Sequence, residues 1–202
     1  MWTIPNQITL FRILLIPVFV VVFYMHDLYP DTFSKNWSNF GSFAVFWLAA
    51  VSDAVDGYLA RKLKQSTKFG AFIDPVADKL MVTMALVLIV SEYQNLWVTV
   101  PALIMIAREI IISALREFMA DLGKRDNVAV SDLGKWKTAA QMLALMGLIW
   151  HPNYPIPLYF FELPQEIINY AAWGFYFFAT IFAFVSMFQY LKASWPELSG
   201  KS

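Results

Sequence analysis

Long apolar runs separated by short polar connectors dominate the chain. A membrane-spanning helix needs about 20 mostly apolar residues, and six stretches reach roughly that length. These stretches cover residues 8–25, 40–59, 72–90, 97–118, 133–150 and 167–191. Because they take up most of the chain and no internal repeat is detectable, the pattern predicts one all-α integral membrane domain over residues 1–202, with six transmembrane helices.

Basic residues are concentrated in alternate connectors. The connectors after the second and fourth stretches and the C-terminal tail contain Arg61, Lys62, Lys64, Lys68, Lys124, Arg125, Lys192 and Lys201. The other connectors together contain only Lys35. Since Lys and Arg favour the cytoplasmic side of a membrane, we expect both chain ends and the two basic loops to be cytoplasmic. The first stretch has no small-residue cleavage site after it, which favours a retained span over a signal peptide.

Composition supports a membrane location and narrows the chemistry. Apolar residues make up 59% of the chain and charged residues 15%, against roughly 45–50% and about 25% in soluble domains. Fifteen basic residues balance fifteen acidic ones, so no attraction to nucleic acid is expected. The chain has no Cys, which excludes a disulfide, a thiolate metal site and a cysteine nucleophile.

Acidic residues within the apolar stretches need a reason, because an ionised Asp at the centre of a span costs about 2.5–3.5 kcal/mol. Helical spacing places them on two stripes that small residues share. The first stripe consists of Asp53, Asp56, Gly57 and Ala60. The second consists of Gly70, Asp74 and Asp78. Only a short connector separates the two helices, so we expect the stripes to face each other.

Four converging carboxylates repel one another unless cations lie between them. Hard oxygen donors without imidazole or thiolate favour Mg²⁺, Mn²⁺ or Ca²⁺. Four acids suit a pair of ions about 3.5–4 Å apart, an arrangement that supports phosphoryl transfer. The alternative is a structural ion network of these acids with Arg61, Lys62, Lys79 and Arg108. We favour the metal site, because both stripes carry small residues beside the acids.

The spacing Asp53-x2-Asp56-Gly57-x2-Ala60-Arg61-x8-Gly70-x3-Asp74-x3-Asp78 resembles the signature of the CDP-alcohol phosphotransferases at all eight positions. Residues 6–12, 107–117 and 133–138 are similar to bacterial members that use glycerol 3-phosphate. The resemblance implies the six-helix fold of that family, generally dimeric, in the bacterial inner membrane with a cytoplasmic active site. It further implies transfer of the phosphatidyl group from CDP-diacylglycerol to sn-glycerol 3-phosphate with release of CMP.

The resemblance also implies roles for individual residues. Asp53, Asp56, Asp74 and Asp78 would bind divalent metal, expected as two Mg²⁺ or Mn²⁺ ions, and Asp78 would be the general base. The residue pattern alone does not distinguish which acid is the base, since that depends on reach and pKa. Binding of the CDP-lipid is expected at Asp56, Gly57, Ala60, Arg61 and Gly70. Close helix packing is the alternative reason for the small residues.

The remaining cations predict a site for a second anionic group. Arg108 and Arg116 are eight residues apart and share a helix face, while Lys135 and Lys137 begin the next cytoplasmic-side stretch. A phosphate on the acceptor explains these cations better than serine or a neutral alcohol does. Interfacial lysines that merely extend to water are the alternative for the last pair.

The residues alone leave two alternatives open, namely another acceptor within the same family and a carrier. Inositol phosphate would satisfy the same cations, so only the resemblance favours glycerol phosphate, and a phospholipid acceptor is a further alternative within the family. A divalent-cation or proton carrier could also place acids among six helices. A carrier site lies near the bilayer midplane, whereas these acids lie toward one end of their stretches, which favours the transferase.

Overall fold

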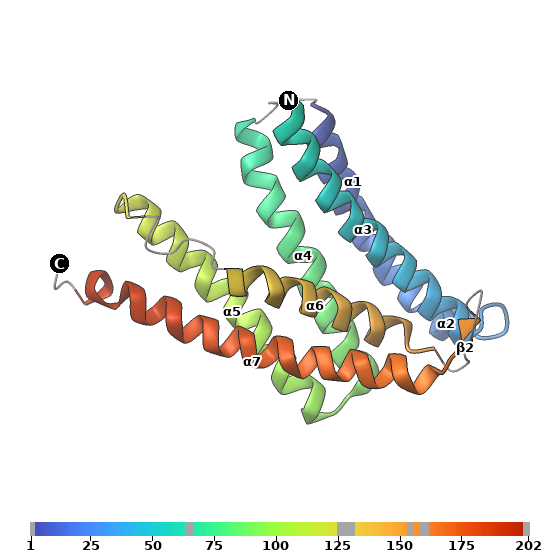
Figure 1. The fold of residues 1–202 in the computed structure, drawn as a ribbon. Helices are drawn as coiled ribbons and strands as arrows, with labels where there is room; N and C mark the ends of the chain where they lie inside the picture. The colour runs from blue at the N-terminus through green and yellow to red at the C-terminus, as the bar shows by residue number, and fades with distance from the viewer. Residues whose placement is uncertain (1–2, 64–66, 125–131, 153–155, 158–161, 200–202) are drawn as a thin grey trace.

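The computed structural model describes residues 3–63, 67–124, 132–152, 156–157 and 162–199 (Figure 1). In these ranges nearly all of the chain is helical, and two residue pairs form a minimal antiparallel ladder. The elements are α1 Ile4–Phe23, α2 Met25–Leu28, α3 Lys35–Leu63, α4 Lys68–Tyr93, α5 Leu96–Asp121, α6 Asp132–Trp150, β1 Ile156–Pro157, β2 Glu162–Leu163 and α7 Gln165–Leu198.

Each of the six predicted apolar stretches coincides with one long helix, so the all-helical prediction is confirmed. Within the described residues, four segments are long and apolar enough to cross a membrane: α1, Lys35–Leu59 of α3, α5 and α7. Thr138–Trp150 of α6 is apolar but shorter, and α4 has charged residues in its first half. These helices indicate a membrane protein, and the count of six spans stays a prediction.

The helices pack as two antiparallel pairs that contact each other through α3 and α6, and α4 and α5 pack against these pairs. In Figure 1, α1 runs alongside α3 and α6 runs alongside α7, while α4 packs on α1 and α5 packs on α7. The interior between them is apolar and closely packed. Side chains buried completely or nearly so include Phe19, Phe46, Leu86, Ile89, Met105, Leu145 and Tyr176.

Two local sequence signals fix the turn between α4 and α5. Gln94 ends α4 in the left-handed region, with φ at 46°. Asn95 then caps α5, because its side-chain oxygen accepts a hydrogen bond from the Val98 amide at 3.1 Å. Capping of this kind satisfies an amide that would otherwise lack a partner. The tight turn makes α4 and α5 antiparallel neighbours, so charged residues on both helices can reach one pocket.

The outer surface of the bundle is rich in large apolar side chains, most clearly along α7. Such extensive apolar exposure is unusual for a soluble monomer and suits contact with lipid chains. The exposed residues of this helix include Ile167, Phe175, Phe178, Ile181, Phe184, Val185 and Phe188.

Candidate active site

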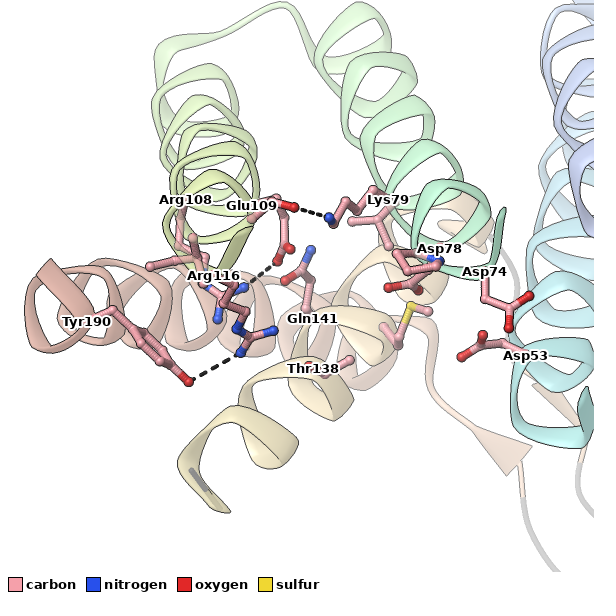
Figure 2. A pocket seen from close by; sticks show the side chains of 15 residues that line it. Asp53, Asp74, Asp78, Lys79, Arg108, Glu109, Arg116, Thr138, Gln141 and Tyr190 are labelled. Atoms are coloured by element: carbon pink, nitrogen blue, oxygen red, sulfur yellow. Dashed lines mark hydrogen bonds and ion pairs between the residues drawn. The ribbon is translucent and has the colours of Figure 1, made fainter. Parts of the chain in front are cut away.

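A pocket of about 520 Å³ opens among five of the long helices (Figure 2). Its lining changes character from one side to the other, with carboxylates from α3 and α4 and cations from α5. We call these sides the acidic half and the basic half. The acidic half contributes Asp53, Asp74 and Asp78, and the basic half contributes Arg108 and Arg116 together with Glu109. The pocket therefore brings together two sets of residues that the sequence predicts as parts of one site.

Three of the four signature acids line the pocket directly. Figure 2 shows the carboxylates of Asp53 and Asp74 directed toward each other, with Asp78 one turn beyond Asp74 on α4. Asp56 lies one turn after Asp53 on α3 and is buried, with 4% of its surface exposed. The predicted convergence of the two stripes is thus seen in the structure.

A buried arginine from α1 joins the acids of α3. Arg12 is 1% exposed; its Nη1 lies 2.5 Å from Asp53 Oδ1, and its Nη2 donates to Asp56 Oδ2 at 2.6 Å. Arg12 is not among the site residues that the sequence pattern predicts. The available signal was its charge inside the first apolar stretch, because an arginine there needs an acidic or carbonyl partner.

A threonine one turn earlier on α1 links the acids of α3 and α4. Thr9 is fully buried, and its Oγ1 lies 3.1 Å from Asp56 Oδ2 and 2.7 Å from Asp74 Oδ1. The hydroxyl also lies 3.1 Å from the Pro5 carbonyl oxygen. Because a hydroxyl has a single proton, it donates to one of these three acceptors at a time, and the Asp74 oxygen is the nearest. No sequence signal singled out Thr9, since threonine is common in apolar helices.

The carboxylates fit a hard divalent cation by the chemistry of their donors. Arg12 and Thr9 occupy one oxygen of each of Asp53, Asp56 and Asp74. As the described side chains stand, no three acidic or histidine residues are close enough to share one ion. Binding of an ion would therefore need small side-chain rotations that bring the remaining oxygens together.

The basic half is held more loosely than the acidic half. Arg108 is 8% exposed and pairs with Glu109 at 2.7 Å on its own helix. Arg116 donates to the hydroxyl of Tyr190 on α7 at 3.4 Å and lies 5.5 Å from the centre of its ring. Among the described residues, Nε of both arginines is buried without a hydrogen-bond partner. A buried donor without a partner is costly, and an anionic ligand in the pocket would satisfy it.

The structure describes only some of the other predicted site residues. Gly57 lies half-buried on α3, and Gly70 is buried where α4 meets α1. A Cβ at Gly70 would meet the Asn6 Oδ1 atom at 2.6 Å and would displace that side chain, so helix packing also favours a glycine there. The side chains of four predicted site residues lie outside the described part of the structure, namely Ala60, Arg61, Lys135 and Lys137.

Several pocket residues were not predicted as site residues. Lys79 of α4 donates to the Ser113 hydroxyl of α5, and Gln141 of α6 is buried with its amide in the middle of the pocket (Figure 2). Thr138 and Tyr190 complete the wall from α6 and α7. Lys79 was expected only as part of the alternative ion network, and uncharged polar residues on later helices carry no charge or spacing signal that would indicate a site.

These features define a polar pocket, with carboxylates on one side and arginines on the other, within a bundle of long apolar helices. The chain belongs to the CDP-alcohol phosphatidyltransferase family, because that family's model matches residues 2–188. It is 50% identical over 197 residues to the CDP-diacylglycerol–glycerol-3-phosphate 3-phosphatidyltransferase of Escherichia coli K12, covering 98% of this chain and 97% of that protein. Proteins of the same name from Shigella sonnei and Shigella flexneri serotype 5b match with the same identity and coverage. The family predicted from the signature is confirmed.

Proposed function

We propose that the protein transfers the phosphatidyl group of CDP-diacylglycerol to sn-glycerol 3-phosphate, giving phosphatidylglycerol phosphate and CMP. The observation that carries this proposal is the pocket in which signature carboxylates lie opposite Arg108, which is buried, and Arg116, which is half-buried. The 50% identity to enzymes named for this reaction supports the choice of substrates. A carrier is disfavoured, because this chain matches proteins named as transferases along nearly their whole length.

The acidic half would perform the chemistry. Asp53, Asp56, Asp74 and Asp78 would hold two divalent cations, Mg²⁺ or Mn²⁺, which neutralise the diphosphate and stabilise the departing CMP when bound. Asp78 would accept the proton of the acceptor hydroxyl. The resulting oxygen attacks the lipid-side phosphorus, a new P–O bond forms, and the bond to the CMP phosphate oxygen breaks. Most of the rate would come from positioning and electrostatics.

The basic half would bind the phosphate of the acceptor. Arg108 and Arg116 both open into the pocket and both keep a buried Nε without a partner in the described residues. Guanidinium groups bind phosphate through paired, charge-assisted hydrogen bonds. Lys135 and Lys137 would add charge from the beginning of α6. The acceptor would then lie with its phosphate at α5 and its hydroxyl toward Asp78.

The CDP-lipid would lie along α3 and the beginning of α4. The residues proposed for this contact are Asp56, Gly57, Ala60, Arg61 and Gly70. The enzyme would work in the bacterial inner membrane as a homodimer, with both termini and the pocket on the cytoplasmic side. The Lys and Arg bias of the connectors supports this orientation.

Release of CMP by the purified protein in detergent tests the proposal. The assay uses CDP-diacylglycerol and Mg²⁺ with glycerol 3-phosphate, inositol phosphate, serine or phosphatidylglycerol, each with and without EDTA. We expect CMP release only when glycerol 3-phosphate is the acceptor, and we expect EDTA to abolish this release. Release with inositol phosphate or phosphatidylglycerol instead would refute the acceptor, and activity that survives EDTA would refute the metal requirement. No release from folded protein with any acceptor would refute the transferase itself.

A further inference from the structure

We propose that α1 positions the metal ligands of the acidic half through Thr9 and Arg12. The inference rests on the proposed metal dependence and goes beyond it, because α1 carries none of the signature acids. It assigns no reacting group to α1. It states that two buried polar side chains of this helix set the orientation of carboxylates on its two neighbours.

The arginine holds two acids of one helix turn in a fixed relation. Its Nη1 reaches Asp53 Oδ1 and its Nη2 reaches Asp56 Oδ2. A planar guanidinium can span two carboxylates at a fixed angle, whereas a lysine ammonium acts as one compact charge. The Arg12 side chain is 2% exposed and that of Asp56 is 6% exposed, so water has little access to this contact, whereas the Asp53 side chain is 47% exposed toward the pocket.

The threonine extends the same scaffold to the next helix. Thr9 Oγ1 lies within 3.1 Å of one oxygen from Asp56 and one from Asp74. It lies three residues before Arg12, so the two side chains share a face of α1. The face therefore contacts acids on both α3 and α4.

The pattern of occupied oxygens connects these contacts to metal binding. Each of Asp53, Asp56 and Asp74 uses one oxygen toward α1, and the described residues give its second oxygen no partner. Carboxylates that bind a metal through one oxygen are commonly oriented by a hydrogen bond to the other. The contacts from α1 have this form, so they would reduce the rotation needed when an ion enters.

Binding of Mn²⁺ alone, followed by electron paramagnetic resonance on the detergent-purified protein without lipid or acceptor, tests the inference separately from activity. Thr9→Val removes the hydroxyl at nearly constant volume, and Thr9→Ser keeps it. Arg12→Lys keeps the positive charge and loses the planar guanidinium that can contact two carboxylates at once. We expect the Kd for Mn²⁺ to rise at least about tenfold in Thr9→Val and Arg12→Lys. Thr9→Ser should retain wild-type affinity, which a merely structural role would not predict.

A steady-state assay gives a second readout. The two weakened variants should lose kcat at saturating Mg²⁺ while the KM for glycerol 3-phosphate stays near the wild-type value, because the arginines of α5 are untouched. Equal Mn²⁺ affinity in Thr9→Val and Thr9→Ser would overturn the role of the hydroxyl, whether both were normal or both were weak. Wild-type Mn²⁺ affinity in Arg12→Lys would overturn the role of the guanidinium.

Asp74→Asn separates this inference from the proposed function. If wild-type protein binds Mn²⁺ and Asp74→Asn does not, the metal proposal stands and the α1 variants decide the inference. If wild-type protein shows no Mn²⁺ binding, both the metal proposal and the positioning role fail.

Discussion

The acidic and basic halves of the pocket differ in what holds their charged groups. On the acidic half, side chains from a third helix fix carboxylates at contacts of 2.5 to 3.1 Å. On the basic half, Arg108 pairs with its own neighbour and Arg116 reaches Tyr190 at 3.4 Å. Among the described residues that line the pocket, Nε of Arg108 and Nε of Arg116 are buried without a hydrogen-bond partner. Behind the acidic half the same holds for Nε and Nη1 of Arg12, although Nη1 keeps its ion-pair contact with Asp53.

This difference suits two different tasks. Bond making requires groups placed to within a fraction of an ångström, which a scaffold of three helices can provide. Binding a phosphate requires donors with unused capacity, which adjust to the ligand. Changes in the acidic half should therefore lower kcat, and changes in the basic half should raise the KM of the acceptor.

Replacement of the proposed base should have the largest effect. Asp78→Asn removes proton acceptance with almost no change in shape, so we expect CMP release to fall at least about 100-fold. Asp27→Asn on the exposed α2, outside the pocket, is the matched control and should keep full activity. Turnover by Asp78→Asn near that of the control would remove Asp78 as the base.

Removal of a cation from the basic half should act on acceptor binding. Arg116→Met keeps the apolar stem and loses charge-assisted hydrogen bonds of about 1.5–3 kcal/mol, so the KM for glycerol 3-phosphate should rise roughly 10- to 100-fold. The KM for CDP-diacylglycerol should change little. Lys124→Met is the control, because Lys124 pairs with Glu197 at the ends of α5 and α7. A fall in kcat that exceeds the rise in KM would contradict the division between the two halves.

A packing change outside the pocket should leave both kinetic constants unchanged. A Cβ at Gly147 of α6 would meet the Ala172 Cβ of α7 at 2.5 Å, so Gly147→Ala should cost about 1–3 kcal/mol through overpacking. The measurement is the melting temperature in detergent, with Gly174→Ala as control because nothing lies within 4 Å of its Cβ position. An altered KM in folded Gly147→Ala would show that the pocket depends on this helix contact.

The helices and the acidic stripes could be predicted because both depend on local spacing. Apolar runs of sufficient length gave the six long helices, and offsets of three and four residues placed Asp53 with Asp56 and Asp74 with Asp78. The shared helix face of the two α5 arginines could be predicted for the same reason, because Arg108 and Arg116 lie eight residues apart.

The contributions of other helices could not be predicted from spacing. Arg12 reaches acids more than 40 residues away, and Tyr190 meets Arg116 from a helix 74 positions later. Such contacts depend on how helices pack, which no single helix pattern specifies. Gly70 illustrates the same limit, because helix packing was one of two reasons offered for its small size, but the stripe alone did not identify Asn6 of α1 as the packing partner.

The length of α7 has a consequence for how substrates meet. Its 34 residues span about 51 Å at 1.5 Å per residue, well beyond a hydrocarbon core of about 30 Å. Tyr190 lies where the apolar stretch 167–191 ends, so if α7 spans the bilayer as we propose, this wall of the pocket would lie near the headgroup layer. A dissolved acceptor and an acyl-anchored donor would then approach from different phases. Reaction velocity should accordingly follow the surface density of the donor in a vesicle or micelle rather than its bulk concentration.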